Sequence, residues 1–315
     1  MGKWLQGIWK SVWRIGWPQD ERSAVKAMLS SLVLHVHAPK IRPESLKFRA
    51  SWAAGLISLV LALQLTATGI YLMFYYIPHP DAAWRSMKDL AFVVPLGTLT
   101  RNAHRWAAHA MVAMVTVHMV RVYMVSGYKG TRQANWVAGV GLWFLTLALS
   151  FTGYLLPWDQ LAYWAVTVGS NMAAAIPFIG DDFRQLILGD RSVGESALLR
   201  FYVLHCVALP AILFLIVGFH LFRVRKDGGL VVSEHAPGGG RGEEGHKLVP
   251  AWPHLVYREL IVALVATAAL LALAVWLQAP LEPEADPSRT PNPAKAPWYF
   301  LGVQELAHYS AFWGG

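Results

Sequence analysis

The sequence predicts an all-α integral membrane protein with a four-helix transmembrane bundle, a fifth transmembrane helix and an N-terminal helix at the membrane surface. Of the 315 residues, 55% are hydrophobic and only 15% are charged, and the mean hydropathy is positive. This composition is typical of a chain whose core lies in a bilayer. Five apolar segments are long enough to cross the bilayer as helices. Two of them contain pairs of histidines at helical spacing.

The five predicted spans alternate in direction across a prokaryotic-type cytoplasmic membrane. Positions 1 to 49 contain nine Lys or Arg against three acids, which predicts a cytoplasmic N-terminus. The acid-rich loop 157–197 and the C-terminal tail then lie on the outer face, and the Gly-rich connection lies in the cytoplasm. The predicted helices are 50–76, 103–125, 135–156, 198–225 and 255–279. The predicted domains are 1–47 (N-terminal segment), 48–226 (four-helix domain), 227–249 (connection) and 250–315 (C-terminal segment).

The N-terminal segment lacks the continuous apolar core of a signal peptide, so no cleaved leader is expected. Its tryptophans alternate with basic residues, which favours a helix in the lipid headgroup region. A helix packed on a partner subunit is the alternative. The residues of this pattern are Trp4, Trp9, Trp13 and Trp17 with Lys3, Lys10 and Arg14.

Two predicted helices each contain two histidines that face the same way. His104 and His118 are fourteen residues apart, which on a helix means about 21 Å of rise and an offset of about 40°. His205 and His220 are fifteen apart, with an offset of about 60°. If the two helices are antiparallel neighbours, His104 faces His205 at one level and His118 faces His220 at the other.

Two facing imidazoles at each level suit a six-coordinate haem iron between helices of a bundle. A single histidine in an apolar helix is more often hydrogen-bonded or faces a pore. Four histidines in two matching pairs favour two haems, because each unpartnered polar group in hydrocarbon costs several kcal/mol. A transporter with intramembrane histidines is a competing interpretation, but no inverted repeat supports it.

Glycines follow the same spacing as the histidines. They form two pairs, each fourteen residues apart, on the first and third predicted helices: Gly55 with Gly69, and Gly139 with Gly153. Because glycine has no side chain, it lets a flat macrocycle approach the helix backbone. Ordinary small-residue helix packing is the alternative, but two pairs in register with the histidines favour haem contact.

Cysteine content and charge exclude several other functions. Cys206 is the only cysteine, so an intrachain disulfide, a c-type haem attachment and a four-cysteine iron–sulfur site are excluded. Beside His205 in an apolar helix, it is expected to be a packing residue. The net charge of +8 could suggest nucleic acid as a partner. We reject nucleic acid because the basic residues cluster next to the spans, where they set topology.

These segments resemble the cytochrome b subunit of quinol-oxidising bc and bf complexes, from about Phe48 onward. The matching runs are TRNAHRW with His118 fourteen residues on, TGYLLPWDQLAYWAV at 152–166 and RFYVLH at 200–205 with His220. The fifteen-residue spacing and PWDQ are similar to the plastid-type bf subunit. PAWPH at 250–254 and LEPEADPSRTP at 281–291 resemble the start of that complex's subunit IV. The chain thus resembles a fusion of the bf-type cytochrome b subunit with the start of subunit IV. The further helices of subunit IV are expected to lie on another polypeptide, or the protein functions without them.

The resemblance implies specific cofactor and substrate contacts. His104 with His205 would ligate a b-type haem near the outer face, and His118 with His220 one near the cytoplasm. Haem propionates would pair with arginines, for which interfacial anchoring is the alternative. These arginines are Arg101, Arg105 and Arg121. The outer quinol pocket would consist of Gly153, Tyr154, Pro157, Trp158, Pro297, Trp298 and Tyr299.

The chain departs from the family pattern at two positions. The family commonly has Pro-Glu-Trp-Tyr where this chain has Ala296 before Pro297, Trp298 and Tyr299, so the usual proton-accepting carboxylate is missing. Glu305 is the hypothesised replacement, although an exposed helix-end glutamate explains it equally well. Ala53 stands at the position of a cysteine that binds a third haem in bf-type subunits. A covalent third haem is therefore not expected, and a non-covalent one stays open.

The resemblance implies a dihaem subunit of a membrane quinol:acceptor oxidoreductase. Quinol would be oxidised at the outer face, and electrons would pass to a soluble acceptor and across the membrane through the two haems. Partners would be a Rieske-type iron–sulfur protein, c-type cytochrome subunits, or both, in a homodimeric complex. The alternative is a haem-carrying membrane anchor that exchanges electrons between the quinone pool and a non-Rieske module without bifurcation.

Overall fold

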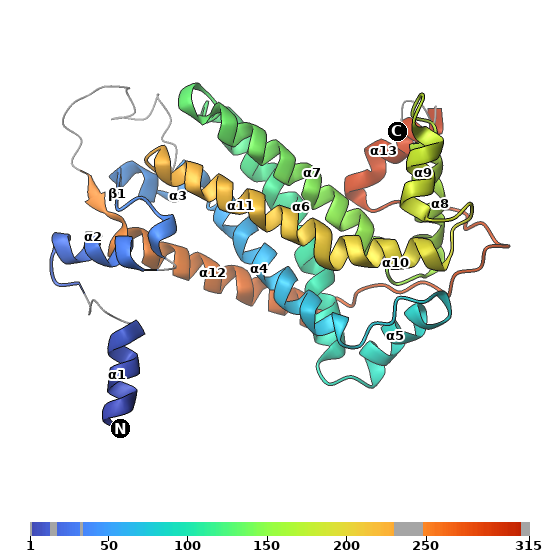
Figure 1. Ribbon diagram of the computed structural model, residues 1–315, viewed down its shortest axis with the longest axis horizontal. Helices are drawn as coiled ribbons and strands as arrows, with labels where there is room; N and C mark the ends of the chain where they lie inside the picture. The colour runs from blue at the N-terminus through green and yellow to red at the C-terminus, as the bar shows by residue number, and fades with distance from the viewer. Residues whose placement is uncertain (1, 13–17, 32–33, 230–247, 310–315) are drawn as a thin grey trace. The chain divides into compact units, whose positions relative to one another are not determined.

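The computed structural model describes residues 2–12, 18–31, 34–229 and 248–309, and its regular secondary structure is almost entirely helical (Figure 1). Trp13, Arg14, Trp17 and most of the predicted Gly-rich connection lie outside the described residues. The α-helices are α1 (Lys3–Val12), α2 (Glu21–Ser30), α3 (Phe48–Ser51), α4 (Ala54–Met73), α5 (Pro80–Phe92), α6 (Gly97–Met124), α7 (Gln133–Leu155), α8 (Gln160–Ala174), α9 (Gly180–Leu188), α10 (Glu195–Val203), α11 (Leu209–Lys226), α12 (Ala251–Trp276) and α13 (Leu301–Tyr309).

The remaining elements are short. They are the 3₁₀ turns η1 (Leu34–Val36), η2 (Pro43–Leu46), η3 (Gly130–Arg132) and η5 (Trp298–Phe300), the π turn η4 (Leu204–Ala208), and the strands β1 (Lys40–Ile41) and β2 (Val249–Pro250). The two strands pair antiparallel, with Lys40 opposite Pro250 and Ile41 opposite Val249.

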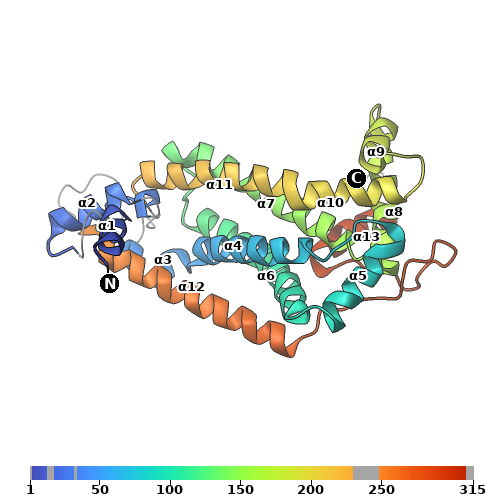
Figure 2. The ribbon, with the colours of Figure 1, turned by 60° about the horizontal axis from the view of Figure 1, so that its bottom comes forward.

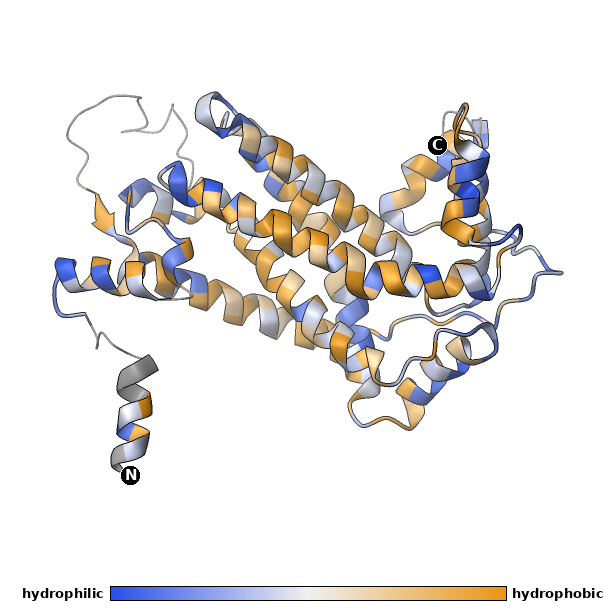
Figure 3. Cartoon of the chain, in the orientation of Figure 1, coloured by the Kyte–Doolittle hydropathy of each residue, from blue (hydrophilic) through white to orange (hydrophobic). Residues whose placement is uncertain are grey.

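Five helices within the described ranges are long and apolar enough to cross a membrane: Ala54–Met73, Gly97–Met124, Gly130–Leu155, Glu195–Lys226 and Ala251–Trp276. Figure 3 shows apolar residues along most of their length. Hydroxyl side chains inside them donate to carbonyls of the preceding turn, as Thr66 does to Ala62 and Thr146 to Leu142. In hydrocarbon such internal partners replace water. The predicted fold class, an all-helical membrane protein with five spans, is confirmed.

The N-terminal segment contains two helices where one was predicted. The second helix begins at a capping box, in which the Asp20 carboxylate accepts from Ser23 N–H at 2.7 Å and the Ser23 hydroxyl accepts from Asp20 N–H at 3.1 Å. Asp and Ser at this spacing satisfy two of the free N–H groups at a helix start. On α1, Trp4 is exposed, and its place in a headgroup region stays a prediction.

The chain divides into two compact units that cut across the predicted domain boundaries, which therefore stay predictions. Unit 1 consists of Met1–Ile57, Val115–Gly141 and Ile216–Ala266. Unit 2 consists of Ser58–Met114, Leu142–Leu215 and Thr267–Gly315. Each long helix contributes residues to both units. His118 and His220 belong to unit 1, and His104 and His205 belong to unit 2.

In unit 1, the residues before α3 pack on the start of α12. Met28, Ile41 and Ala251 are buried in one cluster with Ala38 and Leu255. An ion pair joins the same two regions, because His37 Nε2 lies 2.9 Å from Glu259 Oε2. The other ring nitrogen, Nδ1, lies 3.1 Å from the Leu34 carbonyl oxygen. Both partners are acceptors, so the ring is an imidazolium that donates twice.

In unit 2, the loop between α7 and α10 folds into the neighbouring helices α8 and α9, which lie side by side in Figures 1 and 2. The sequence predicts an ordered element here. The buried Asp159 caps α8 by accepting from Ala162 N–H at 2.9 Å, and it also accepts from Glu282 N–H at 3.1 Å. Gln160 binds the backbone of Asp286. The PWDQ run therefore holds the segment after α12 in place.

The C-terminal end of α12 is held by polar side chains of α6. The buried Asn102 donates to the Ala274 carbonyl at 2.9 Å and accepts from Ala279 N–H at 2.8 Å. Trp106 donates to the Leu277 carbonyl at 2.7 Å. Arg101 donates to the carbonyls of residues 279 and 280 at 2.9 and 2.6 Å. These contacts satisfy backbone groups that a helix end otherwise leaves free.

We expect removal of the His37–Glu259 ion pair to lower stability only where His37 is charged. Burial alone would lower the pKa of His37, but the hydrogen bond and negative charge of Glu259 raise it above its ordinary value. The pair is therefore fully stabilising below about pH 6.5, where a free histidine titrates, and this contribution is lost as pH rises through the raised pKa. His37→Gln should lower the free energy of unfolding by about 1 kcal/mol near pH 6 and by much less near pH 9.

Thermal unfolding in detergent at both pH values measures this difference. Glu259→Gln is the matched variant and should show the same pH dependence. An equal loss of stability at both pH values would contradict a charged pair.

Candidate functional site

Unit 2 places His104 of α6 and His205 of the π turn opposite each other, with their rings nearly perpendicular. Their ring centroids are 6.2 Å apart and the ring planes are inclined by 79°. Nδ1 of His205 donates to the Leu149 carbonyl at 3.1 Å, since a carbonyl can only accept. Nδ1 of His104 lies 2.9 Å from the Thr68 hydroxyl, whose own proton points to the Gln64 carbonyl at 2.7 Å. Both neutral rings therefore carry the proton on Nδ1 and leave the Nε2 lone pair free.

Unit 1 brings His118 of α6 and His220 of α11 together in the same way. Their ring centroids are 6.3 Å apart, and the planes are inclined by 82°. Nδ1 of His220 is buried near the Asn135 backbone without reaching hydrogen-bond geometry. The two histidine pairs thus have nearly the same separation and inclination, each within its own unit.

The four predicted glycines each adjoin one of these imidazoles. A Cβ added to Gly55 would lie 2.9 Å from Cε1 of His118, and one added to Gly139 would lie 3.7 Å from Cε1 of His220. The same atom would lie 3.2 Å from Cε1 of His104 at Gly69, and 2.5 Å from Cε1 of His205 at Gly153. The backbone thus leaves room for a histidine ring at every level. Contact between these glycines and a macrocycle stays a prediction.

The residues present fit a haem at each level. A centroid separation of 6.2 or 6.3 Å admits one metal ion with metal–nitrogen bonds of about 2 Å on both sides. Across the described ranges, no group of three or more His, Cys, Asp or Glu could hold a metal ion. Two protein ligands per level leave four positions around an octahedral ion, which is the number a porphyrin fills.

A π turn explains the longer histidine spacing on one helix. In η4, Leu209 N–H donates to the Leu204 carbonyl, five residues back. A π turn takes up one residue more than an α-helical turn. Pro210 follows and has no N–H for the Cys206 carbonyl. The fifteen-residue spacing therefore acts as fourteen residues of α-helix, and the predicted offset of about 60° is reduced to the value on α6.

The three predicted propionate-binding arginines have different surroundings. Nε of Arg105 and Nε of Arg121 are buried without a hydrogen-bond partner within the described part of the chain. Arg121 also lies over the Trp52 ring, 5.0 Å from its centroid. An unpartnered guanidinium N–H suits an anion. Arg101 instead donates to backbone carbonyls after α12. The propionate role of all three stays a prediction.

Part of the predicted quinol pocket forms an aromatic cluster around His109, a third histidine of α6. We name the set Arg105, His109, Tyr154, Trp298 and Tyr299 the α6–η5 cluster. Trp298 Nε1 donates to His109 Nδ1 at 3.0 Å, and the Tyr299 ring meets the His109 ring at 5.5 Å. Arg105 lies over the Tyr154 ring, 5.3 Å from its centroid. Sequence reasoning gave His109 no role. Two features of the sequence could have indicated a role. His109 follows Arg105 by four residues and so shares its helix face, and the C-terminal segment is rich in aromatic residues.

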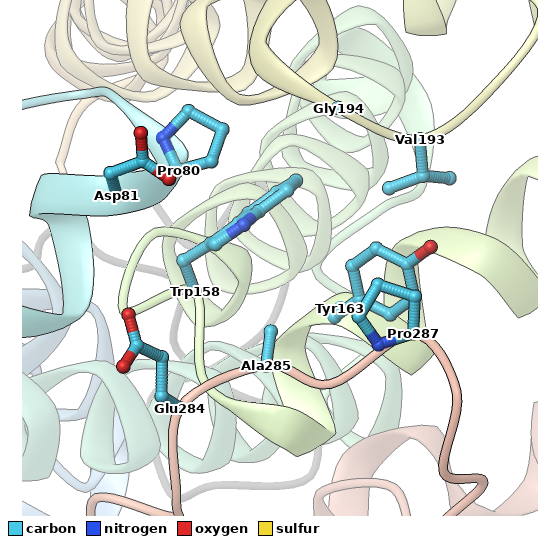
Figure 4. Close-up of a pocket in the computed structure, with 9 residues that line it drawn as sticks. All are labelled: Pro80, Asp81, Trp158, Tyr163, Val193, Gly194, Glu284, Ala285 and Pro287. Atoms are coloured by element: carbon cyan, nitrogen blue, oxygen red, sulfur yellow. The ribbon is translucent and has the colours of Figure 1, made fainter.

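Other predicted pocket residues lie elsewhere in unit 2. Trp158, preceded by Pro157, is buried, packs edge-on against Tyr163 and lines a pocket of about 210 Å³ (Figure 4). Asp81 and Glu284 contribute carboxylates to this pocket. Pro297 directly precedes η5. Glu305 is exposed on α13. The catalytic roles assigned to these residues stay predictions.

Comparisons with known proteins give a consistent result. A family model described as Cytochrome b/b6/petB matches residues 40–228. The chain is 44% identical over 177 residues to the cytochrome b6 of Prochlorococcus marinus strain MIT 9515, covering 56% of this chain and 81% of that protein. With the same coverage, it is 43% identical to the cytochrome b6 of strain NATL1A. It is also similar to a chain of a solved structure described as Hyperthermophilic respiratory Complex III, with TM-score 0.79 and 26% identity, covering 94% of this chain and 77% of that one.

Shortening the π turn by one residue should preserve both histidine pairs. Deletion of the exposed Val207 converts the spacing to fourteen residues of α-helix and keeps His205 and His220 on one side. Insertion of one alanine after Ile212 is the matched opposite change, because it rotates His220 by about 100° relative to His205. We expect two haems per chain after the deletion and one after the insertion, by pyridine haem assay. Loss of a haem from the deletion variant would contradict the π-turn explanation.

Alanine at the crowded glycines should lower haem content in the order of crowding, with little effect expected at Gly139. Gly153→Ala should have the largest effect and Gly139→Ala the smallest, since their added Cβ atoms would lie 2.5 and 3.7 Å from a histidine carbon. Gly141, where an added Cβ meets nothing within 4 Å, is the matched control. Haem content and visible spectra of the purified variants test the order. Equal haem loading in Gly153→Ala and Gly141→Ala would show that the close approach is irrelevant.

Proposed function

The chain belongs to the cytochrome b/b6 family, and on that premise we propose that it is the dihaem subunit of a membrane quinol:acceptor oxidoreductase. Members of this family typically bind two b haems. The observation that carries the proposal is the pair of facing imidazoles in each unit, each ring beside a glycine. His104 with His205, and His118 with His220, are the proposed axial ligands. When bound, the haems supply reversible one-electron chemistry.

The protein's own part begins with the orientation of the ligands. Leu149 and Thr68 fix the proton of His205 and His104 on Nδ1, so that Nε2 of each is available. An outer partner of this kind fixes the tautomer and the ring orientation of a metal ligand and raises its basicity. In unit 1, the buried Nδ1 of His220 lies beside the Asn135 backbone. Arg105 and Arg121 supply buried guanidinium N–H groups for the carboxylates of the cofactors.

Quinol oxidation is proposed at the outer face, next to the His104 level. The basic N-terminal segment favours a cytoplasmic N-terminus. One crossing, by α4, then puts the start of α6 outside, and the third crossing, by α7, puts the end of α7 outside. Tyr154, Trp298 and Tyr299 of the α6–η5 cluster lie at these helix ends or in the tail that follows α12. Aromatic walls with a few polar groups are typical of sites for flat organic ligands. Pro297, Pro157, Trp158 and Gly153 complete the proposed surroundings.

The predicted partners follow from the redox chemistry. Within the described residues, no group of side chains could hold an iron–sulfur cluster, and we propose that the outer electron acceptor is carried by another polypeptide. We propose a Rieske-type iron–sulfur protein, with c-type cytochrome subunits in the same homodimeric complex. The similarity to a chain of a respiratory Complex III supports a multi-subunit assembly. The segment from residue 250 onward is proposed to correspond to the start of subunit IV of plastid-type bf complexes.

A second function is favoured by one specific residue. Ala296 stands where the family commonly has a glutamate, and a pocket without a proton acceptor does not oxidise quinol efficiently. The chain could then act as a haem-carrying anchor that passes electrons between quinone and a non-Rieske module. The identity of the co-purifying soluble subunit distinguishes the two functions.

We expect two b haems with separate potentials in the purified complex. His104→Ala and His118→Ala should each lose one haem and one potential, because each removes one of two axial ligands at one level. His308→Ala, which changes an exposed histidine on α13, should retain both. Redox-poised visible spectra, a pyridine haem assay and subunit identification make the measurement. Two haems in His104→Ala would contradict the proposed ligand set, and a non-Rieske partner would favour the anchor.

A further inference from the structure

His109 is the histidine of α6 that neither facing pair uses. It lies five residues after His104 and four after Arg105, so it shares a helix face with Arg105. Its ring is half-buried and contacts the rings of Trp106 and Tyr299, both at 5.5 Å between centroids. An imidazole at this depth needs a polar partner, and the structure gives it one from a distant part of the chain.

That partner determines the protonation state of His109. Trp298 Nε1 lies 3.0 Å from His109 Nδ1, and an indole nitrogen can only donate. Nδ1 therefore presents a lone pair, and the neutral ring carries its proton on Nε2. This is the reverse of His104 and His205, whose Nδ1 atoms donate to protein oxygens. The Nδ1 lone pair of His109 is directed at the Pro297–Trp298–Tyr299 segment. His109 is therefore placed to accept a proton there and not to bind a haem iron.

The donor on this lone pair is also replaceable. Trp298 is 52% exposed, so its indole can move away without uncovering a packed core. A hydroxyl on a flat ring can donate to the same Nδ1 in its place. The α6–η5 cluster offers the walls for such a ring, with Tyr299 beside His109 and Tyr154 under the Arg105 guanidinium. Arg105 and Tyr299 are the charged and titratable groups beside His109, and the carboxylates of Asp159 and Glu282 act on Tyr154 of the same cluster.

We propose that His109 is the proton acceptor for quinol in this chain, in place of the carboxylate missing at Ala296. The inference rests on the proposed function, because it needs quinol at the α6–η5 cluster. A quinol hydroxyl displaces the Trp298 indole, its O–H bond breaks, and an N–H bond forms at Nδ1 of His109. One electron passes to the soluble one-electron acceptor and the other to the outer redox centre, and the second quinol proton passes to water on the outer face. Nε2 of the imidazolium then releases its proton.

Arg105 makes this acceptor a transient one. Its guanidinium lies one helical turn before His109 on the same face, and like charges repel. An imidazolium formed at His109 is therefore short-lived. Because uptake occurs at Nδ1 and release at Nε2, the ring moves the proton from the quinol side to its other side. Glu305, exposed on α13, is not required in this scheme.

Two substitutions at His109 separate proton uptake from packing. His109→Asn places an amide oxygen near the position of Nδ1, so it can accept from Trp298 but cannot take up a proton. His109→Glu provides an ionisable acceptor whose ordinary pKa is about two units lower. The matched control is His308→Gln, which removes an exposed histidine of α13. Haem content and visible spectra of every purified complex verify that the histidine pairs are intact.

The measured quantity is the rate at which quinol reduces the outer b haem, recorded between about pH 5 and pH 9. We expect His109→Asn to lower this rate about a hundredfold with an unchanged haem spectrum, since general bases contribute at least that much. His109→Glu should restore activity with an acid limb about two pH units lower. His308→Gln should match the wild type.

A wild-type rate and pH profile in His109→Asn would overturn the proposal, as would a shift of the acid limb in Glu305→Gln but not in His109→Glu. If His109→Asn does not assemble, the pH profile of His109→Glu alone decides. A wild-type complex that binds two haems but never oxidises quinol would overturn the quinol-oxidising function and this inference together. Quinol oxidation that does not depend on His109 would overturn only the inference.

Discussion

In the membrane core, a protein partner on one ring nitrogen of an imidazole leaves the other nitrogen available to a cofactor, and His104 and His205 are held in this way. Hydrocarbon provides no water to hydrogen-bond, so an unassigned N–H costs several kcal/mol. The Leu149 carbonyl and the Thr68 hydroxyl meet this need for His205 and His104. These contacts require close helix neighbours, and the glycines beside the rings make that approach possible. The orientation of the histidine ligands therefore depends on the close packing of the helices that carry the glycines.

The membrane-spanning helices were predicted from local sequence. Apolar length identified all five spans, because burial of backbone groups in a membrane leaves the helix as the available structure. Residue spacing identified which histidines share a helix face, and the structure brings His104 to His205 and His118 to His220. Element ends were less accurate. The N-terminal segment contains two helices, since Asp20 and Ser23 form a capping box that was not considered.

The contacts between distant residues could not be predicted. Asn102 binds the end of α12, more than 170 residues later in the chain, and neither end of that contact has a sequence signature. The π turn at Leu204–Ala208 is also invisible locally, although Pro210 removes an N–H nearby. His109 needed the position of Trp298 before its tautomer could be read. For Asn102 and His109, the sequence did not show which distant residue makes the contact, and local helix propensity carries no such information.

The capping of α12 by α6 has a consequence for how this kind of chain can be divided. Asn102, Trp106 and Arg101 hold one end of α12, and the β1–β2 pairing with the His37–Glu259 pair holds its other end. All of these contacts join parts of the chain that lie before residue 230 or after residue 247. A break between these positions would leave each of them in place, and it would remove the effective concentration that the covalent link supplies. The same docking contacts can therefore hold α12 whether one polypeptide or two carry the sequence.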